Sequence, residues 1–176
     1  LLIDLQTFTV TVNPINDPPI AISSSVSINE DQSTVIALSG NDIDGDNLTF
    51  TLNADADATN GSVTLDGSLA TYTPDTDFNG DDSFSFTVSD GEYSSNADVT
   101  VSITAVNDAP VLATVSDVSF DEDGSGSAGL SGSDVDGDDL TYNITGGSDI
   151  IATLDGSSIS FSSPENYNGS ESFTVA

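Results

Sequence analysis

The chain has 176 residues, of which 30 are Asp or Glu and none is Lys, Arg or His, so its formal net charge is −30. This charge excludes nucleic-acid binding, which needs basic groups to displace counterions, and it opposes docking on an anionic membrane surface. The absence of Cys and His removes disulfides, thiolate and imidazole metal ligands, and the commonest general base. No apolar run approaches the length of a membrane span, so we expect no direct membrane insertion.

Short stretches that alternate apolar with polar residues run along the chain. In chain order they include residues 8–12, 48–52, 62–65, 84–88 and 99–103. A period of two predicts β-strands that have one buried face and one wet face. Turn sequences such as Asp66-Gly67, Asn79-Gly80 and Asp90-Gly91 separate the strands, and no segment has convincing helical spacing. The predicted fold class is therefore all-β.

The sequence also repeats itself, with a period of about 91 residues. Asn16-Asp17-Pro18-Pro19 returns as Asn107-Asp108-Ala109-Pro110. Asp42-Ile43-Asp44-Gly45-Asp46 returns as Asp134-Val135-Asp136-Gly137-Asp138. About seven short strands in each repeat favour tandem Greek-key β-sandwiches.

The repeats are out of phase with the ends of the chain. We expect residues 1–15 to be the closing strand of a preceding repeat, residues 16–106 a complete repeat, and residues 107–176 a second repeat that stops before its last strand. Two explanations remain open. The chain can be a window of a long tandem array, or residues 1–15 of one copy can complete residues 107–176 of another by strand addition. The second arrangement would join identical chains head to tail into a homopolymer.

The acidic residues have a composition that suits a hard cation. They comprise 25 Asp and only five Glu, and the short Asp stem holds its carboxylate close to the backbone carbonyls that share an ion. Asp42-x-Asp44 and Asp134-x-Asp136 each present two carboxylates ahead of a Gly that permits a sharp turn. Because the chain has no basic side chain, such clusters must take their positive charge from solution. We therefore expect Ca²⁺ as the cofactor.

The order of these motifs carries a family resemblance. Glu30, Asp42-x-Asp44-Gly45, Val88-Ser89-Asp90-Gly91 and Val106-Asn107-Asp108-Ala109-Pro110 follow one another along the chain. In this order they resemble the cadherin-like tandem repeats of bacterial surface adhesins. The resemblance covers essentially the whole chain and implies a cadherin/Ig-like sandwich that binds calcium at the junctions between repeats.

The resemblance also implies which residues bind the metal. At the junction of the two repeats the implied ligands are Glu30, Asn107, Asp108, Asp134 and Asp136. At the preceding junction they are Asn16, Asp17, Asp42, Asp44 and Asp90. Further candidates are Asp46 and Asp138, which extend the Asp runs, Glu122, which matches Glu30, and Asp75 and Asp77, the nearest match to a carboxylate pair of the family. We expect Asp55, Asp57, Asp81, Asp82 and Asp139 on the solvated surface.

These observations predict a non-enzymatic module that calcium makes rigid. Its expected role is the stalk or fibre backbone of a secreted, extracellular or cell-surface protein in cell adhesion or matrix. Weak calcium sites suit that location, because extracellular modules bind calcium at about 10⁻⁴–10⁻³ M. Its expected partners are neighbouring repeats of the same or an identical chain. The alternatives are a self-assembling filament joined by strand complementation and, third, a polysaccharide-binding module, which is disfavoured because the chain has no Trp and four Tyr.

Overall fold

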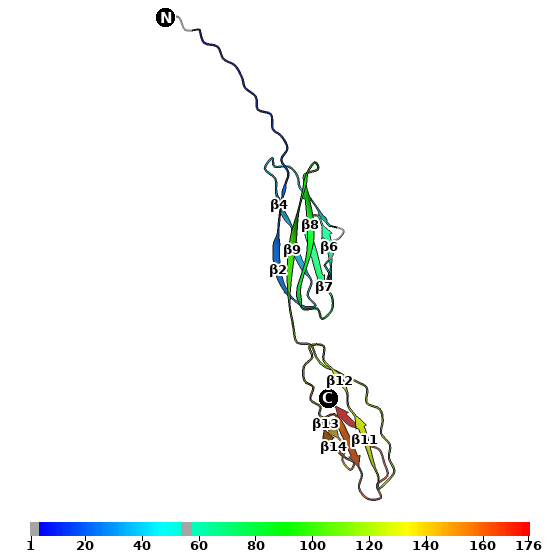
Figure 1. The fold of residues 1–176 in the computed structure, drawn as a ribbon. Helices are drawn as coiled ribbons and strands as arrows, with labels where there is room; N and C mark the ends of the chain where they lie inside the picture. The colour runs from blue at the N-terminus through cyan, green and yellow to red at the C-terminus, as the bar shows by residue number, and fades with distance from the viewer. Residues whose placement is uncertain (1–3, 54–57) are drawn as a thin grey trace. The chain divides into compact units, whose positions relative to one another are not determined.

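The computed structural model describes residues 4–53 and 58–176, and every regular element in these ranges is a β-strand. The strands belong to two compact units, unit 1 up to Val106 and unit 2 from Asn107 to Ala176 (Figure 1). Nowhere in the described ranges does the chain form a helix long and apolar enough to cross a membrane. The prediction of an all-β fold is confirmed.

The described part of unit 1 has nine strands. Their bounds are Ile20–Ile22 (β1), Ser24–Asn29 (β2), Thr34–Ala37 (β3), Ser39–Asn41 (β4), Thr49–Leu52 (β5), Gly61–Asp66 (β6), Leu69–Pro74 (β7), Gly80–Ser89 (β8) and Ser94–Thr104 (β9). They include the strands predicted over residues 48–52, 62–65, 84–88 and 99–103, each to within a few residues.

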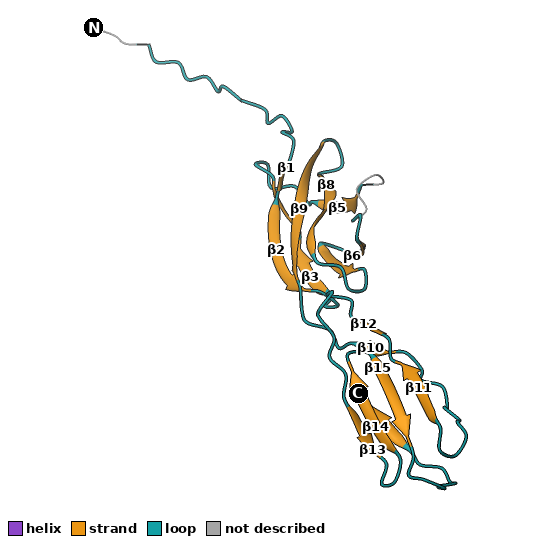
Figure 2. Cartoon of the chain, turned by 60° about the horizontal axis from the view of Figure 1, so that its bottom comes forward, coloured by secondary structure: helices purple, strands orange, loops and turns teal. Residues whose placement is uncertain are grey.

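The nine strands of unit 1 form the two layers of a sandwich (Figure 2). One layer has the order β2-β9-β8-β5, with β2 parallel to β9 and the other neighbours antiparallel. The other layer has the order β3-β7-β6, and β1 pairs with β4, which follows β3 after Leu38. The extended segment of residues 20–29 thus divides at Ser23: β1 before it pairs with β4, and β2 after it pairs with β9. This division and the one at Leu38 account for nine strands rather than seven.

The core of unit 1 lies between the two layers. Tyr72 of β7 belongs to one buried cluster with Phe84, Phe86 and Val88 of β8, and all four side chains are almost completely buried. β9 lies between β2 and β8 and contributes every second side chain, namely Ala97, Val99, Val101 and Ile103. These four side chains retain 0–7% of their exposure. The alternation in the sequence therefore separates the buried face of β9 from its solvent face.

Unit 2 has seven strands that are shorter. Their bounds are Val111–Leu112 (β10), Ser125–Gly129 (β11), Gly132–Ser133 (β12), Ile144–Gly146 (β13), Ile151–Asp155 (β14), Ser158–Ser162 (β15) and Phe173–Val175 (β16). The sheets have the orders β11-β15-β14, β13-β16 and β10-β12.

Unit 2 keeps the pattern of unit 1 in part. Ile144 pairs with Val175 in unit 2 as Leu52 pairs with Phe86 in unit 1. Residues 116–121, which correspond to β2, form no strand ladder in the described part of unit 2. Within that part, no strand occupies the position that β9 takes in unit 1. The buried apolar side chains of unit 2 are accordingly few, namely Leu130, Ile159 and Phe161.

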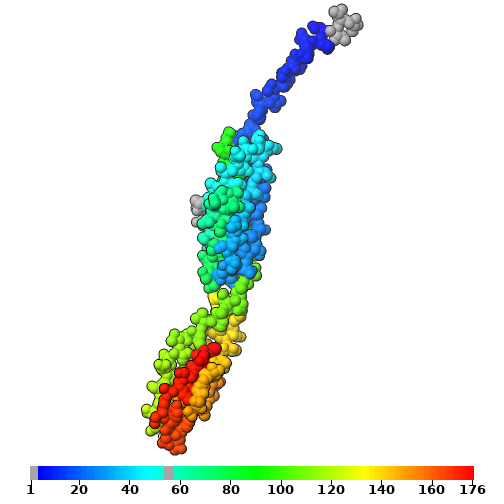
Figure 3. Space-filling view, turned by 180° about the vertical axis from the view of Figure 1, so that it is seen from behind, coloured from blue at the N-terminus to red at the C-terminus, as the bar shows by residue number. Residues whose placement is uncertain are grey.

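The segment that precedes unit 1's first strand pairs with no strand of the described chain. Residues 4–15 stand clear of the sandwich of unit 1 (Figure 3). Phe8, Val10 and Val12 alternate with Thr and are 88%, 74% and 89% exposed. Their assignment to the closing strand of a preceding repeat stays a prediction.

Candidate metal centre

A tight loop after β4 arranges the first group of acidic side chains. Asp42 turns one carboxylate oxygen, Oδ1, back onto the loop, where it accepts hydrogen bonds from the N–H groups of Asp44, Gly45 and Asp46 at 2.9, 3.0 and 3.3 Å. Gly45 has φ = +81°, a left-handed conformation that a Gly adopts without strain. The Asp-x-Asp-Gly-Asp sequence therefore builds a loop whose amides face its first carboxylate.

Two further segments join this loop at the same end of unit 1. The N–H of Asp17 donates to Oδ2 of Asp44 at 2.8 Å. The side-chain amide of Asn16 donates to Oδ2 of Asp90 at 3.0 Å. We call Asn16, Asp17, Asp42, Asp44 and Asp90 the first Asp cluster. The structure thus brings together the residues that the family resemblance assigned to the preceding junction, and their binding of a metal stays a prediction.

Asp90 is held in its ionised form by its own turn. Its carboxylate accepts hydrogen bonds from the N–H groups of Tyr93 at 2.6 Å and Glu92 at 2.7 Å, besides the Asn16 amide. These bonds, the one from Tyr93 first, lower the pKa of Asp90 below its ordinary value. The neighbouring charges of Glu92, Asp90 and Asp17 raise the pKa of the Tyr93 hydroxyl. Negative charge therefore accumulates around this turn.

The first Asp cluster has an acceptor that nothing in the described chain satisfies. Oδ2 of Asp42 is buried and has no hydrogen-bond partner among the described residues. A buried polar atom without a partner is costly, and the chain contains no cationic side chain that could pair with it. Calcium coordinates six to eight oxygens from carboxylates, Asn side chains and backbone carbonyls. The donor set of the first Asp cluster fits such an ion.

Unit 2 repeats this geometry. The N–H of Asp108 donates to Oδ2 of Asp136 at 2.7 Å, as Asp17 does to Asp44. Oδ1 of Asp134 accepts from the N–H groups of Asp136 at 3.0 Å and Asp138 at 3.3 Å. Gly137 has φ = +80°, as Gly45 does. We call Asn107, Asp108, Asp134 and Asp136 the second Asp cluster.

Glu30 lies at the other end of unit 1, directly after β2. It is the most deeply buried carboxylate described, with 3% of its surface exposed. One of its oxygens accepts a short hydrogen bond from the N–H of Val106, and the other accepts a longer one, 3.5 Å, from the Asn79 amide. Glu30 therefore ties down the last residue of unit 1. Its matching residue, Glu122, is exposed in unit 2.

Asp75 and Asp77, the two candidate residues that precede β8, interact with different partners. The N–H of Asp77 donates to the Asp31 carboxylate at 3.2 Å, and both residues have positive φ. The carboxylate of Asp75 instead acts on the Tyr72 hydroxyl, whose pKa it helps to raise. Asp31 was not among the predicted site residues. Its repetition as Asp123, which accepts from the N–H of Asn166 at 2.9 Å, was the signal available in the sequence.

The expectation that Asp82 is a solvated surface residue is wrong. Asp82 is 7% exposed and accepts hydrogen bonds from the Tyr72 hydroxyl at 2.8 Å and from the N–H groups of Thr59 and Asn60 at 3.1 Å. It lies on the inward face of β8, where the alternation places an apolar residue, and a loop and a Tyr hydroxyl supply its partners. Of the other four residues expected on the surface, the structure describes two. Asp81 and Asp139 are exposed, and Asp55 and Asp57 lie outside the described residues.

Glu171 has the same role in unit 2. Its carboxylate accepts from the hydroxyl and N–H of Ser148 at 2.7 and 2.8 Å, and from the N–H groups of Asp149 and Ile150 at 2.9 and 3.0 Å. Asp82 thus holds the loop that leads into β6 of unit 1, and Glu171 holds the loop that leads into β14 of unit 2. They are structural anchors and not members of the Asp clusters.

These bonds predict an acid-sensitive contribution to the stability of unit 2. The bond from the Asp149 N–H first, then those from Ser148, lower the pKa of Glu171 from 4.5 to about 2. Because the folded pKa is the lower one, the contribution is complete above pH 4.5 and is lost as the pH falls towards 2. We expect Glu171→Gln to lower the free energy of unfolding at neutral pH and to converge with the unsubstituted protein near pH 2. Urea titrations across this range measure the difference, and a gap that stays constant would contradict the assignment.

The remaining predicted ligands, Asp46, Asp138 and Asn107, form hydrogen bonds within their own loops. Asp46 and Asp138 donate their N–H groups to the first Asp of each loop, and their own side chains are exposed. The Asn107 side-chain amide donates to the carbonyl of Asp108 at 2.8 Å. The part of the site that spans Glu30 and the second Asp cluster stays a prediction.

A sequence model of the family described as the bacterial Ig domain matches residues 16–104 and, a second time, residues 107–176. A search of curated proteins finds no match to the chain.

Solved structures with similar folds include cadherins. The chain matches human protocadherin-24 EC1-2 (form II) with a TM-score of 0.55 and 17% identity, over 91% of this chain and 86% of that one. It matches Drosophila N-cadherin EC1-4 with a TM-score of 0.47 and 14% identity, over 92% of this chain and 48% of that one. The endo-fucoidan hydrolase MfFcnA4 of glycoside hydrolase family 107 has a TM-score of 0.41 and 20% identity over 89% of this chain, which spans 26% of the hydrolase. The family match and the protocadherin likeness confirm the predicted tandem sandwich and the resemblance to bacterial cadherin-like repeats.

Proposed function

Because the chain belongs to the bacterial Ig domain family and carries that domain twice, we propose that it is a calcium-stiffened extracellular repeat module. Domains of this kind are typically non-enzymatic and typically lie outside the cell or on its surface. The module serves as a stalk or fibre backbone in cell adhesion or in a matrix.

The observation that carries this proposal is the first Asp cluster. Hydrogen bonds join Asn16 to Asp90 and Asp17 to Asp44 there, the chain has no cationic side chain, and the buried Oδ2 of Asp42 is left without a hydrogen-bond partner among the described residues. Two unit charges about 4 Å apart repel by about 4 kcal/mol at an effective dielectric constant near 20. A bound calcium ion would reverse that repulsion and satisfy the buried oxygen.

Stiffening follows from the elements that the cluster joins. Asn16 and Asp17 belong to the segment that enters unit 1, whereas Asp42 and Asp44 belong to the loop after β4. An ion held by both would reinforce the single backbone bond from Asp17 to Asp44. Asp108 and Asp136 repeat this bond in unit 2. In each repeat the ion would therefore restrain the orientation of the segment that enters the repeat.

Glu30 supports the same interpretation from the other end of unit 1. Its carboxylate binds the N–H of Val106, the residue that immediately precedes Asn107 in the sequence. The segment that leaves unit 1 is thus restrained close to its last strand. The sharing of an ion between Glu30 and the second Asp cluster is part of this proposal.

Small-angle X-ray scattering tests the proposal directly. We expect the addition of calcium at matched ionic strength to increase the radius of gyration and the stiffness of the particle, with constant forward scattering. Magnesium serves as the control for screening, because it demands a tighter octahedral geometry and gives up its water reluctantly. Identical profiles in calcium and in chelator would contradict the proposal.

A second candidate function is a self-assembling extracellular filament. The observation that favours it is the exposure of Phe8, Val10 and Val12 on a segment with the alternation of a buried strand. In the same scattering experiment this function predicts a rise in forward scattering with protein concentration.

The polysaccharide-binding alternative has less support. Such a module would present a strip of exposed aromatic side chains. All 12 Phe and Tyr residues lie in the described ranges, and among them only Phe8 and Tyr93 are exposed. A pull-down on insoluble glycans should therefore retain none of the protein.

A further inference from the structure

Six Asp–Gly dipeptides occur in the chain, and all six lie in the described ranges. In such a dipeptide the backbone nitrogen of Gly can attack the side-chain carboxyl group of the Asp and close a five-membered succinimide ring, because Gly leaves its nitrogen unhindered. The six begin at Asp44, Asp66, Asp90, Asp123, Asp136 and Asp155. Each can react only where the fold lets the carboxyl carbon and the Gly nitrogen approach each other.

Four of the six dipeptides are held at both reacting groups. In Asp44-Gly45 the carboxylate accepts from the N–H of Asp17 at 2.8 Å, and the Gly45 N–H donates to the carboxylate of Asp42 at 3.0 Å. In the other three the carboxylate also accepts a backbone N–H, that of Tyr93 for Asp90, Asn166 for Asp123 and Asp108 for Asp136, at 2.6, 2.9 and 2.7 Å. Their Gly N–H groups donate within the same turn, Gly91 to Ser89, Gly124 to Asp121 and Gly137 to Asp134, at 3.1, 3.0 and 3.3 Å.

The other two dipeptides, Asp66-Gly67 and Asp155-Gly156, are free at both groups. Among the described residues, neither carboxylate accepts a hydrogen bond and neither Gly N–H donates one. Asp66 is the last residue of β6 and Asp155 the last of β14, so the two lie at equivalent hairpin turns of the two units. Both are exposed, but so is Asp44, and therefore hydrogen bonding rather than exposure distinguishes the two groups of sites.

We propose that Asp66 and Asp155 are sites of spontaneous isoaspartate formation in the folded protein. At the first site the nitrogen of Gly67 forms a bond to Cγ of Asp66, and the carboxyl OH and the amide hydrogen leave as one water molecule. Water then opens the ring. Attack at Cγ restores Asp, whereas attack at the main-chain carbonyl breaks the original peptide bond and leaves the chain running through the side chain. The product has the same mass and the same number of carboxylates.

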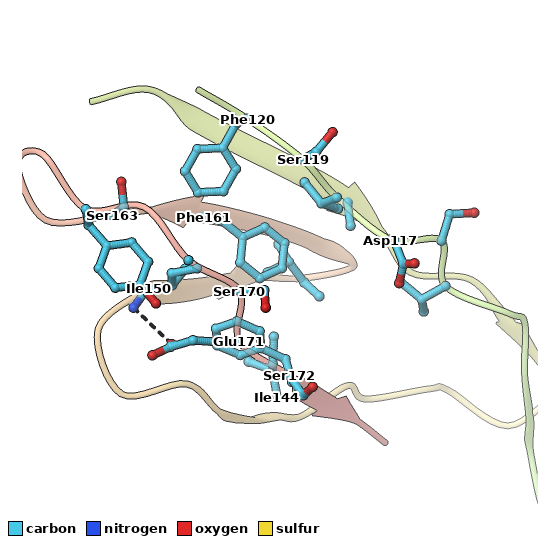
Figure 4. A pocket seen from close by; sticks show the side chains of 18 of the residues that line it. Asp117, Ser119, Phe120, Ile144, Ile150, Phe161, Ser163, Ser170, Glu171 and Ser172 are labelled. Atoms are coloured by element: carbon cyan, nitrogen blue, oxygen red, sulfur yellow. Dashed lines mark hydrogen bonds between the residues drawn. The ribbon is translucent and has the colours of Figure 1, made fainter. Parts of the chain in front are cut away.

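This inference goes beyond the proposed function and needs neither calcium nor a partner. In unit 2 the two ends of one strand show the contrast that it rests on. Glu171 holds the start of β14, where it accepts from the N–H of Ile150 at 3.0 Å (Figure 4). At the other end of β14, Asp155 has no such bond to another described residue. Local opening of this strand therefore costs least at the turn that follows Asp155.

The modification would disturb a contact to the core of each unit. The N–H of Leu38 donates to the carbonyl of Ser68 at 2.8 Å, and the N–H of Leu130 donates to that of Ser157 at 2.7 Å. Leu38 and Leu130 are both 5% exposed. Isoaspartate inserts one extra carbon into the main chain two residues before each of these carbonyls. We therefore expect ageing to weaken the bonds that hold these two Leu residues.

Site-resolved ageing of the full chain tests the proposal. The chain is incubated in chelator, so that bound calcium plays no part, at mildly acidic pH, where the carboxyl group carries the proton that leaves with it. Chymotrypsin replaces trypsin for the digestion, because the chain has no Lys or Arg. Electron-transfer fragmentation then locates isoaspartate, and deamidation at Asn–Gly is separated by its change in mass. We expect isoaspartate at Asp66 and Asp155 to form at least about tenfold faster than at the four other sites.

Ageing in urea is the control for local sequence. Without the fold the six sites should react within about threefold of one another, because the hydrogen bonds that separate them are lost. Equal rates at all six sites in the folded chain would overturn the proposal. A preference for Asp66 and Asp155 that persisted unchanged in urea would overturn it as well, since its cause would then lie in the neighbouring residues and not in the structure.

Asp66→Glu provides the matched variant in unit 1. It keeps the charge, but the longer side chain would have to close a six-membered ring, which forms much more slowly. We expect hydrogen exchange of the Leu38 amide to become about tenfold faster in the isomerised fraction of the unsubstituted chain and to stay constant in Asp66→Glu. Asp81→Glu, at an exposed residue that Asp82 follows, should age as the unsubstituted chain does. Equal ageing of the Leu38 amide in all three proteins would overturn Asp66 as its cause.

Discussion

Replacement of Asp82 by Ala is expected to destabilise unit 1 by about 3–5 kcal/mol, a large part of the 5–15 kcal/mol typical of a domain. The substitution leaves the hydroxyl of Tyr72 without its acceptor in a core position where the side chain is completely buried. It also removes the carboxylate that holds the N–H groups of Thr59 and Asn60. Burial first, and then the bond to Asp82, raise the pKa of the Tyr72 hydroxyl, so this hydroxyl stays a donor at all ordinary pH values.

Urea unfolding of unit 1 measures this effect. Asp81→Ala is the matched control, because Asp81 neighbours Asp82 on β8 and is exposed; we expect a change within about 0.5 kcal/mol. Tyr72→Phe removes only the hydroxyl and should cost about 1–2 kcal/mol. Similar changes in the free energy of unfolding for Asp82→Ala and Asp81→Ala would show that the Asp82 carboxylate does not stabilise unit 1.

Calcium is expected to raise the free energy of unfolding of unit 1 by about 1.4–2.7 kcal/mol at concentrations of 10 to 100 times the dissociation constant. This corresponds to an increase in the thermal midpoint on the order of 5–20 °C for a domain of this size. The gain arises because the ion binds the first Asp cluster in the folded state and has no preformed site in the unfolded chain.

Asp42→Asn should abolish this gain while it preserves the fold of the loop. The Asn carbonyl can accept the amide bonds that Oδ1 of Asp42 accepts, and the side-chain NH₂ replaces the buried Oδ2. We therefore expect normal or higher stability in chelator and no increment with calcium. Asp66→Asn, at the exposed last residue of β6, is the control and should keep the full increment. A full calcium response in Asp42→Asn would exclude Asp42 as a ligand.

Several structural features followed from local sequence patterns. The period of two predicted the strands β5, β6, β8 and β9, because each of them has one buried face. The return of Asp-x-Asp-Gly predicted two loops of similar geometry, and in both the N–H groups of the second and third Asp donate to the carboxylate of the first. Both features depend on neighbours within a few positions, which a sequence displays directly.

Other features depended on residues that are distant in the sequence. Asp82 and the exposed Asp81 are adjacent acidic residues in a strand, and only the Tyr72 hydroxyl and the loop at Thr59 distinguish them. Asp75 and Asp77 likewise have different partners, which the sequence does not reveal. The N–H of Asp77 donates to Asp31, which lies in the connection between β2 and β3. No local pattern encodes such partners.

The sequence by itself determined the fold class, the repeat and the absence of any basic side chain beside the acidic loops, since alternation, periodicity and composition are properties of the chain alone. The tertiary structure decided which carboxylates are anchors and which are left with an unsatisfied oxygen. It also decided which of the six Asp–Gly dipeptides are held by hydrogen bonds. The physical reason is that hydrogen-bond partners and buried neighbours are brought together only when distant strands pair.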